Sequence, residues 1–325
     1  MIFDINEKNY WAVRADGATL HKLFTSESFV AIKHFDKFDK IGPLIDYKGP
    51  IDCFISGIDD NSEEHTIRAR VTQVDAFINK INIGDIAITV GEKKVSFGMF
   101  EGPAFFSKDP IYYDPESTKK KAVEGFFLRR KVNWGPTVDR YTLSKELIKT
   151  LFAHQTVFSL NSHWRDICQR LFPIFKHKHK IFCSLAIRST SQINAKDISP
   201  FLNYLTDMEE FFKDSEINIK ADFNSPGYLF IEHIVGSRGG YALVYFAYSL
   251  LFGNKFFGVD GFITKKSREE FFRVIMEKYR LRNLEDHGRR LGIREPVSPD
   301  ELDAFKDFKV SDDAKISNDE FGEQE

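Results

Sequence analysis

The sequence predicts an α+β protein: a partly open β-barrel with inserted helices over residues 1–165, a smaller α+β domain over 166–298, and an acidic flexible tail over 299–325. Three observations support this prediction. The first half holds short apolar runs joined by hairpin loops, with helical periodicity between them, as in small barrels. The second half alternates apolar strands with longer helical segments. The last 26 residues carry ten acids against three lysines, which is typical of a solvated tail.

The first domain is expected to contain three helices among its strands. The segments 18–27 and 65–81 repeat apolar residues at helical spacing. A third helix over 142–153 has Thr142 or Ser144 as its N-cap, because a hydroxyl oxygen accepts a hydrogen bond from a backbone N–H of the first turn. The expected strands are 10–15, 28–35, 86–90, 95–100, 126–134 and 155–160, and the loop GEKK joins the third and fourth of them into a hairpin.

The second domain is expected to combine three strands with three helices. The strand 217–223 alternates apolar and polar residues. The apolar run Tyr241–Phe252 is shorter than the roughly 20 residues that cross a bilayer, so a buried helix is expected there. Residues 267–284 form an amphipathic helix with a basic face. The remaining elements are strands at 181–189 and 229–235 and a helix at 200–213.

The charge is unevenly distributed, although the net charge is only −2. Residues 264–294 carry ten Lys and Arg against five acids, and residues 163–188 carry six against one. Basic patches favour polyanionic partners such as nucleic acid. Solvated helix faces are the alternative interpretation of each patch.

The composition is that of a globular protein from a reducing compartment. Phenylalanine occurs 33 times, which predicts aromatic-rich cores. The three cysteines, Cys53, Cys168 and Cys183, are widely spaced and indicate neither a disulfide framework nor a cysteine zinc site. The N-terminus has no basic start followed by a long apolar run, so a signal peptide is not expected. A cytoplasmic location fits these features.

Six stretches of the first domain occur in an order that carries a resemblance. They are NYWAVRA, FVAI, FINKINIGDIAIT, VSFGMFEGPAFF, RRKVNWG and LFAHQTVFSL. In this order they resemble the EVE/PUA-like module at the N-terminus of Mrr-type restriction enzymes and related bacterial defence proteins. The resemblance covers about half of the chain. It implies a non-catalytic protein of a prokaryotic anti-phage defence or restriction system, which binds DNA or RNA or reads a modified base in an aromatic pocket.

Eight residues make up the predicted base-binding site. Stacking on an aromatic ring is worth about 1–3 kcal/mol per base, and arginine adds hydrogen-bond donors in a rigid fork. Side chains alternate along YWAVRA, so one face of the strand fills a core and the other presents Tyr10 and Arg14. Trp11 and Trp134 are alternatively plain core residues, and Asp85 is alternatively the cap of its turn. The set is Tyr10, Trp11, Arg14, Asp85, Trp134, Arg129, Arg130 and Lys131, and the last three are expected to line a phosphate backbone with the run 119–121, which is alternatively a solvated loop.

Neither a catalytic centre nor a cofactor or metal site is expected. The stretch GVDGFITKK, with Asp260 and Lys265, lacks the second acid of the nuclease centre in Mrr-type enzymes. His177 and His179 stand among lysines with no third ligand nearby, so a solvated loop is expected instead. The alternative function is a defence effector whose C-terminal domain perturbs membranes or is an unrecognised nuclease. A protein partner or a homo-oligomer that forms through that domain also stays open, whereas a membrane partner is not favoured.

Overall fold

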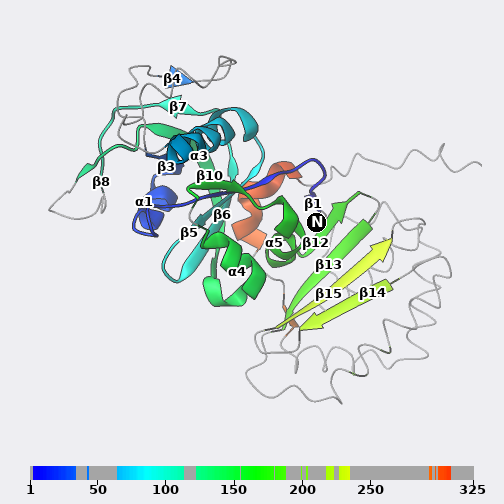
Figure 1. The fold of residues 1–325 in the computed structure, drawn as a ribbon. Coiled ribbons are helices and arrows are strands. Elements are labelled where there is room, and N and C mark those ends of the chain that lie inside the picture. Colours follow the sequence, from blue (N-terminus) through cyan, green and yellow to red (C-terminus); the bar gives the residue numbers. More distant parts are fainter. Residues whose placement is uncertain are drawn as a thin grey trace, which may run out of the picture. The chain divides into compact units, whose positions relative to one another are not determined.

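The chain folds as a mixed α+β protein with a curled, half-barrel sheet (Figure 1). A computed structural model describes residues 3–33, 42–43, 64–112, 122–153, 155–178, 180–187, 199, 203, 217–222, 227–234, 293–294, 297 and 299–308. The chain divides into two compact units. The barrel unit comprises Glu7–Ile167 and Pro299–Phe305, and the sheet unit comprises Met1–Asn6, Cys168–Ser298 and Lys306–Glu325.

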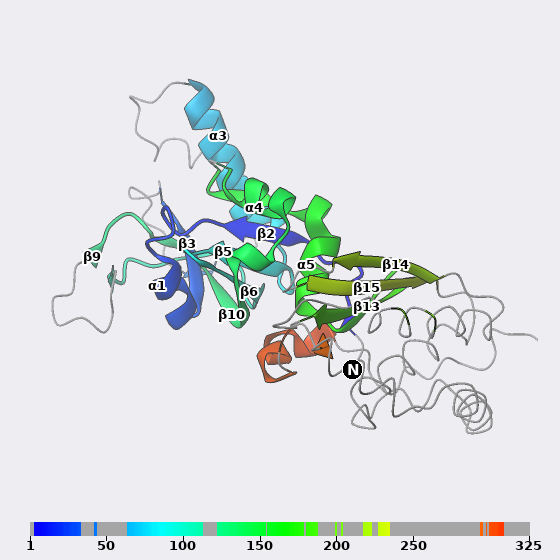
Figure 2. The same cartoon turned by 90° about the horizontal axis from the view of Figure 1, so that it is seen from below.

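The barrel unit is organised around one long strand, β10 (Leu128–Asp139). Its first residues pair with β3 (Phe29–Ile32) and β7 (Phe105–Phe106), and the rest pairs with β6 (Lys94–Phe100). A register shift between Trp134 and Thr137 interrupts the pairing with β6. Because a bulge bends its strand and increases the local twist, the sheet curls along β10 (Figure 2). The sheet order is β11 (Val157–Ser159), β2 (Tyr10–Val13), β5 (Ile86–Val90), β6, β10, β7 and β4 (Gly42–Pro43).

The central hairpin β5–β6 was predicted from the sequence and is confirmed. Its two strands are antiparallel, and Gly91 N donates to Lys94 O across the loop at 2.8 Å. The turn that leads into β5 places Gly84 at a φ of 86°, a conformation that costs a glycine little. Strand β2 then lies parallel to β5, with Trp11 opposite Ala87. The predicted opening strand is therefore a central strand of the sheet, between β5 and β11.

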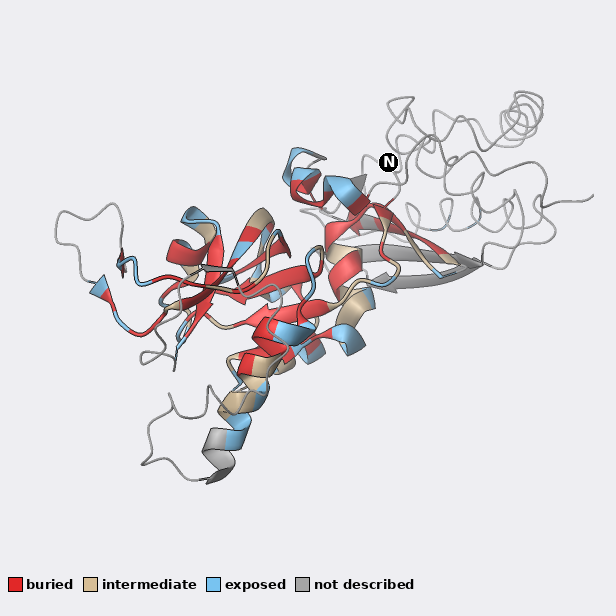
Figure 3. Cartoon of the chain, turned by 90° about the horizontal axis from the view of Figure 1, so that it is seen from above, coloured by how far each residue is buried: buried red, intermediate tan, exposed pale blue. Residues whose placement is uncertain are grey.

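The three helices predicted for the first domain are all present, and one of them ends in a π-helical turn. The segment predicted over 65–81 is α3 (Glu64–Asp75) followed by a π-helical turn, η1 (Ala76–Lys80). The described part of α3 becomes more buried toward η1 (Figure 3). The first predicted helix is shorter than expected, α1 (His21–Ser26), and Ser144 caps α4 (Lys145–Leu151) by accepting from Leu147 N at 3.1 Å. The remaining short elements are β8 (Ile111–Tyr112), β9 (Ala122–Val123), η2 (Arg140–Thr142) and η3 (Asn161–His163).

Phenylalanine dominates the interior of both units, as the composition predicted. In the barrel unit, one continuous cluster joins the curled sheet to α1 and η1. In the sheet unit, the Phe3 ring stacks on Phe172 with centroids 4.7 Å apart. The largest fully buried side chains are Phe3, Phe24, Phe77, Phe97, Phe100, Phe106, Phe172 and Phe175.

The sheet unit contains the three predicted strands as β13 (Lys180–Ile187), β14 (Ile217–Asp222) and β15 (Gly227–Ile234). Strands β1 (Phe3–Asp4) and β12 (Ile174–His177) were not predicted, and they pair in parallel. The first residues of the chain therefore belong to this unit, although they precede the barrel unit in sequence. The sheet order is β1, β12, β13, β15, β14, with β16 (Ile293–Arg294) also on β13. Helix α5 (Trp164–Leu171) contains the division between the units.

Part of the predicted acidic tail is ordered. Residues Pro299–Phe308 form η4, in which Leu302, Phe305 and Phe308 are buried. The acidic composition masked an apolar spacing of about three residues, which suits a 3-10 helix. The rest of the tail and the predicted helices at 241–252 and 267–284 lie outside the described residues, and of the helix at 200–213 only Asn203 is described. None of the helices in the described ranges is both long and apolar enough to traverse a bilayer.

The N-cap of α4 provides a test of the fold. Ser144→Ala removes the acceptor for Leu147 N and the hydroxyl that donates to the Asp166 carboxylate. We expect a loss of about 1–2 kcal/mol in the free energy of unfolding, measured by urea denaturation followed by circular dichroism. Ser144→Thr keeps the hydroxyl, so its free energy of unfolding should be close to that of the wild type. Equal unfolding of the alanine variant and the wild type would contradict the assigned cap.

Candidate nucleic-acid interface

The two aromatic residues that open the first strand are interior residues. Tyr10 is 2% exposed and Trp11 is 8% exposed, because both faces of β2 are covered. Trp11 and the residues that share its face, Val13 and Ala15, belong to the main apolar cluster. Neither ring presents an open face to a base. The predicted role of Tyr10 and Trp11 as stacking walls is therefore corrected: the alternative of a core residue is the one that the structure contains for Trp11.

Asp85 is a buried hub rather than a ligand-binding group. Its carboxylate accepts from the Trp11 indole Nε1 at 3.0 Å and from Asn82 N at 2.9 Å. It also accepts from the backbone N and side-chain Nδ2 of Asn9, at 3.2 and 3.4 Å. A carboxylate offers about four acceptor positions, so these four donors use them all. With Asp85 2% exposed, the interpretation as a turn cap replaces the predicted contact with a base.

The two adjacent arginines of β10 also face inward. Arg130 is 2% exposed, and its guanidinium donates to Ile81 O at 2.7 Å and to Phe77 O and Gly102 O at 3.2 Å. Burial lowers the pKa of Arg130 to about 10, and the nearby Asp85 carboxylate opposes part of that shift. The guanidinium thus stays charged near neutral pH and satisfies carbonyls at the end of η1.

Arg129 is held in the same way from the opposite face of β10. Its Nε donates to Phe126 O at 3.0 Å, Nη1 donates to Ser107 Oγ at 3.3 Å, and Nη2 donates to Asp109 O. Burial lowers the pKa of Arg129, and the charge of Asp109 opposes that effect. Since both arginines spend their donors on the protein's own carbonyls, the prediction that they line a phosphate backbone is wrong. Lys131, the third member of that set, is exposed.

Trp134 is a partly buried residue that is hydrogen-bonded to α1. Its indole Nε1 donates to Phe24 O at 2.7 Å, and the side chain packs, partly buried, against the main cluster. This placement ties β10 to α1. It favours the alternative of a core residue over a wall of a binding pocket.

Arg14 is the predicted site residue that does border an open hollow. The hollow has a volume of about 350 Å³ and, within the described part of the chain, is lined by Arg14, Asp16, Gly17, Lys33, Phe126 and Thr156. One N–H of the Arg14 guanidinium donates to Ala153 O at 2.9 Å, which fixes the side chain. Among the described residues, its other N–H groups have no hydrogen-bond partner. A fixed cation with spare donors is suited to an anion.

The lining of the hollow also contains a second cation and an aromatic ring. Lys33 Nζ lies 5.9 Å from the centroid of the Phe126 ring. These residues come from the end of β3 and the start of β10, which the pairing of Ile32 with Leu128 brings together. Neither Lys33 nor Phe126 was among the residues predicted for the binding site. Only the register between two distant strands places them beside Arg14, and no local pattern encodes that register.

The lip of the hollow has an unusual backbone. Asp16, Gly17 and Ala18 have φ values of 46°, 65° and 82°, so three successive residues are left-handed. Such a conformation costs about 1–3 kcal/mol at a non-glycine residue and is often found at binding sites. A Cβ added at Gly17 would contact nothing within 4 Å. The Asp-Gly dipeptide after the strand was a sequence signal for this turn.

Most of the candidate catalytic and metal residues lie outside the part of the chain that the structure describes. Within the described ranges, no group of three His, Cys, Asp or Glu side chains could hold a metal ion. His177 lies on β12, whereas His179, Asp260, Lys265 and the run 119–121 lie outside the described residues. Cys168 and Cys183 are buried thiols, and burial raises the pKa of Cys183 to about 12. A thiol with a raised pKa is a poor nucleophile.

Comparison with known proteins gave no match. No family model matches the chain, and neither the curated proteins nor the solved structures contain a match to it.

The role of Asp85 can be tested by a single isosteric change. Asp85→Asn places amide N–H groups against existing donors and leaves buried Arg130 without its counter-charge. We expect a loss of about 3–5 kcal/mol in unfolding free energy, measured by denaturant titration of tryptophan fluorescence. The matched control is Asp75→Asn, which removes a carboxylate from a surface pair with Lys80 and should cost less than about 1 kcal/mol. Equal effects of the two changes would contradict a hub at Asp85.

Proposed function

We propose that the barrel unit is a non-catalytic nucleic-acid-binding module that holds one nucleotide of a strand in the Arg14 hollow. The observation that carries this proposal is that a fixed guanidinium and an ammonium both line a hollow of about 350 Å³. That volume lies at the lower end of the roughly 300–1,000 Å³ typical of small-molecule sites. A single nucleotide is a ligand of suitable size.

The charges of the hollow favour a phosphate-bearing ligand. Arg14 and Lys33 supply two positive charges, and Asp16 supplies one negative charge. A guanidinium donates in a planar fork that matches two phosphate oxygens, and an ammonium adds a point charge. The Asp16 carboxylate is a hydrogen-bond acceptor, which a base amino group or a sugar hydroxyl can use. A nucleotide supplies both kinds of group, whereas an inorganic anion supplies only one.

This proposal replaces the predicted recognition of a base in an aromatic pocket with phosphate contacts, and it keeps nucleic acid as the predicted partner. Phosphate contacts by Arg14 and Lys33 position a strand without selecting its sequence. The choice between DNA and RNA, and any preference for a modified base, stays a prediction of the resemblance to EVE/PUA-like modules, as does the defence setting. The alternative of a C-terminal effector is motivated by segments outside the described residues.

Binding of a labelled oligonucleotide tests the proposal. The full chain should bind a fluorescein-labelled, mixed-sequence, single-stranded 12-mer in fluorescence anisotropy, and binding should weaken steeply between about 50 and 200 mM salt. The double variant Arg14→Gln, Lys33→Gln should bind at least about tenfold more weakly, because two charge-assisted contacts are lost. Its log–log salt slope should be shallower by about 1.4.

The control removes the same charge elsewhere on the barrel unit. Lys80→Gln with Lys108→Gln alters two exposed lysines that do not line the hollow. This variant should bind nearly as well as the wild type. The proposal fails if the wild type does not bind at 50 mM salt, or if the two double variants lose the same affinity.

A further inference from the structure

The end of β10 and the end of α4 carry an exposed aromatic platform, formed by Arg140, Tyr141 and Phe152. Tyr141 is 72% exposed and Phe152 is 45% exposed, and they are two of the three large apolar side chains exposed among the described residues. The Arg140 guanidinium carbon lies 5.1 Å from the centroid of each ring. One cation therefore holds two aromatic rings at the surface.

Local hydrogen bonds fix the platform in place. Arg140 N donates to Lys93 O at 2.8 Å, which attaches η2 to the β5–β6 hairpin loop. The Asp139 carboxylate accepts from Tyr141 N at 3.0 Å and caps η2. Arg140 Nη2 also donates to the Tyr141 hydroxyl at 3.3 Å. Rings held in this way lose little conformational freedom when a ligand stacks on them.

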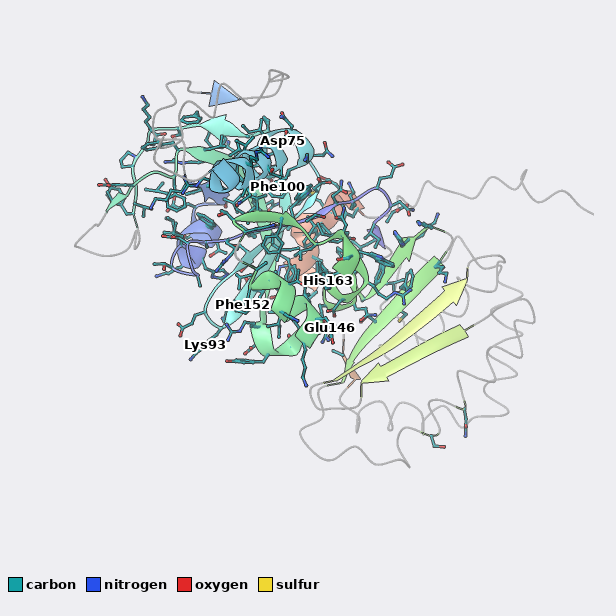
Figure 4. The ribbon with its side chains drawn as sticks, in the orientation of Figure 1. Asp75, Lys93, Phe100, Glu146, Phe152 and His163 are labelled. Atoms are coloured by element: carbon teal, nitrogen blue, oxygen red, sulfur yellow. The ribbon has the colours of Figure 1, made fainter. Side chains whose placement is uncertain are left out.

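The two elements next to the rings, α4 and the β5–β6 hairpin, carry exposed lysines. On α4, Lys145 and Lys149 precede Phe152 by seven and three residues, so these three exposed side chains share one helical face. On the hairpin, Lys93 and Lys94 are exposed, and Figure 4 labels Lys93 and Phe152 at this end of the barrel unit. The acids on these elements and at the end of β10 are Glu92, Asp139 and Glu146. With Arg140 and the four lysines, this region therefore carries five positive charges against three negative charges.

The platform is connected to the Arg14 hollow through a short loop. Phe152 and Thr156, which lines the hollow, are four residues apart, a distance of at most about 14 Å along the chain. The hydrogen bond from Arg14 to Ala153 O anchors the middle of this loop. Stacked nucleotides advance about 3.4 Å each, so about four of them span the interval.

We propose that the platform binds single-stranded nucleic acid by base stacking on Tyr141 and Phe152, and that the same strand continues to the hollow. This inference rests on the proposed function. Rings flanked by cations match the chemistry of a strand, because bases offer flat faces and phosphates offer negative charge. A duplex keeps its base faces stacked internally and cannot use the rings. The platform therefore selects single strands without regard to sequence.

The test compares ring variants in the full chain with the fluorescein-labelled single-stranded 12-mer. Tyr141→Ala with Phe152→Ala should weaken binding by about 5- to 150-fold for each lost stack. Tyr141→Trp should bind as well as the wild type, and unlabelled 12-mer should quench the new indole. Tyr141→Leu keeps apolar area without a π face and should behave like Tyr141→Ala. Because both rings are exposed, circular dichroism and melting temperature should match the wild type.

The outcomes separate this inference from the proposed function. If the wild type binds, the hollow variant binds weakly and the ring variants bind normally, the platform is not a strand site but the proposed function stands. If the wild type binds no oligonucleotide at 50 mM salt, both fail. Full rescue by Tyr141→Leu would contradict stacking. If the ring variants differ from the wild type in molar mass by light scattering but bind the oligonucleotide equally well, the platform is a protein contact and the proposal is overturned.

Discussion

The barrel unit depends on two buried charged groups, Asp85 and Arg130, whose opposite charges attract each other. Asp85 gathers donors from the start of β2 and from the turn before β5, whereas Arg130 gathers carbonyls from the end of η1 and from Gly102. A charge is costly to bury alone, and the Asp85 carboxylate offsets part of the cost of burying the Arg130 guanidinium. Together they fix the place where a helix ends, the central hairpin begins and the longest strand crosses the sheet.

Burial leaves few of the predicted site residues available for binding. Several residues of the resemblance motifs are buried in the interior, among them Trp11, Arg130 and, on the other face of β10, Arg129. Arg14 lies farther along the opening chain segment, beyond the end of β2, where its guanidinium reaches Ala153 O and the hollow. The positive surface that we propose for a strand therefore comes from residues at the ends of strands and helices.

Sequence patterns predicted local structure well and long-range placement poorly. The β5–β6 hairpin follows from alternation and its glycine loop, and hydroxyl chemistry limited the cap of α4 to Thr142 or Ser144, of which the structure has Ser144. The inward direction of Arg129 and Arg130 does not follow from their charge, because it depends on carbonyls 20 or more residues away. The joining of Lys33 with Phe126 depends on strand register, and the exposure of Tyr141 and Phe152 depends on how η2 and α4 meet.

The central claim is that a single strand contacts the barrel unit along the α4–β11 loop. Hydrogen–deuterium exchange of the full chain tests this claim most directly. With a saturating single-stranded oligonucleotide, the account predicts slower exchange in peptides that cover residues 14–18 and 149–157, whereas peptides that contain Asp85 should be unchanged. Protection restricted to residues 168–298, or no protection in the barrel unit, would contradict it.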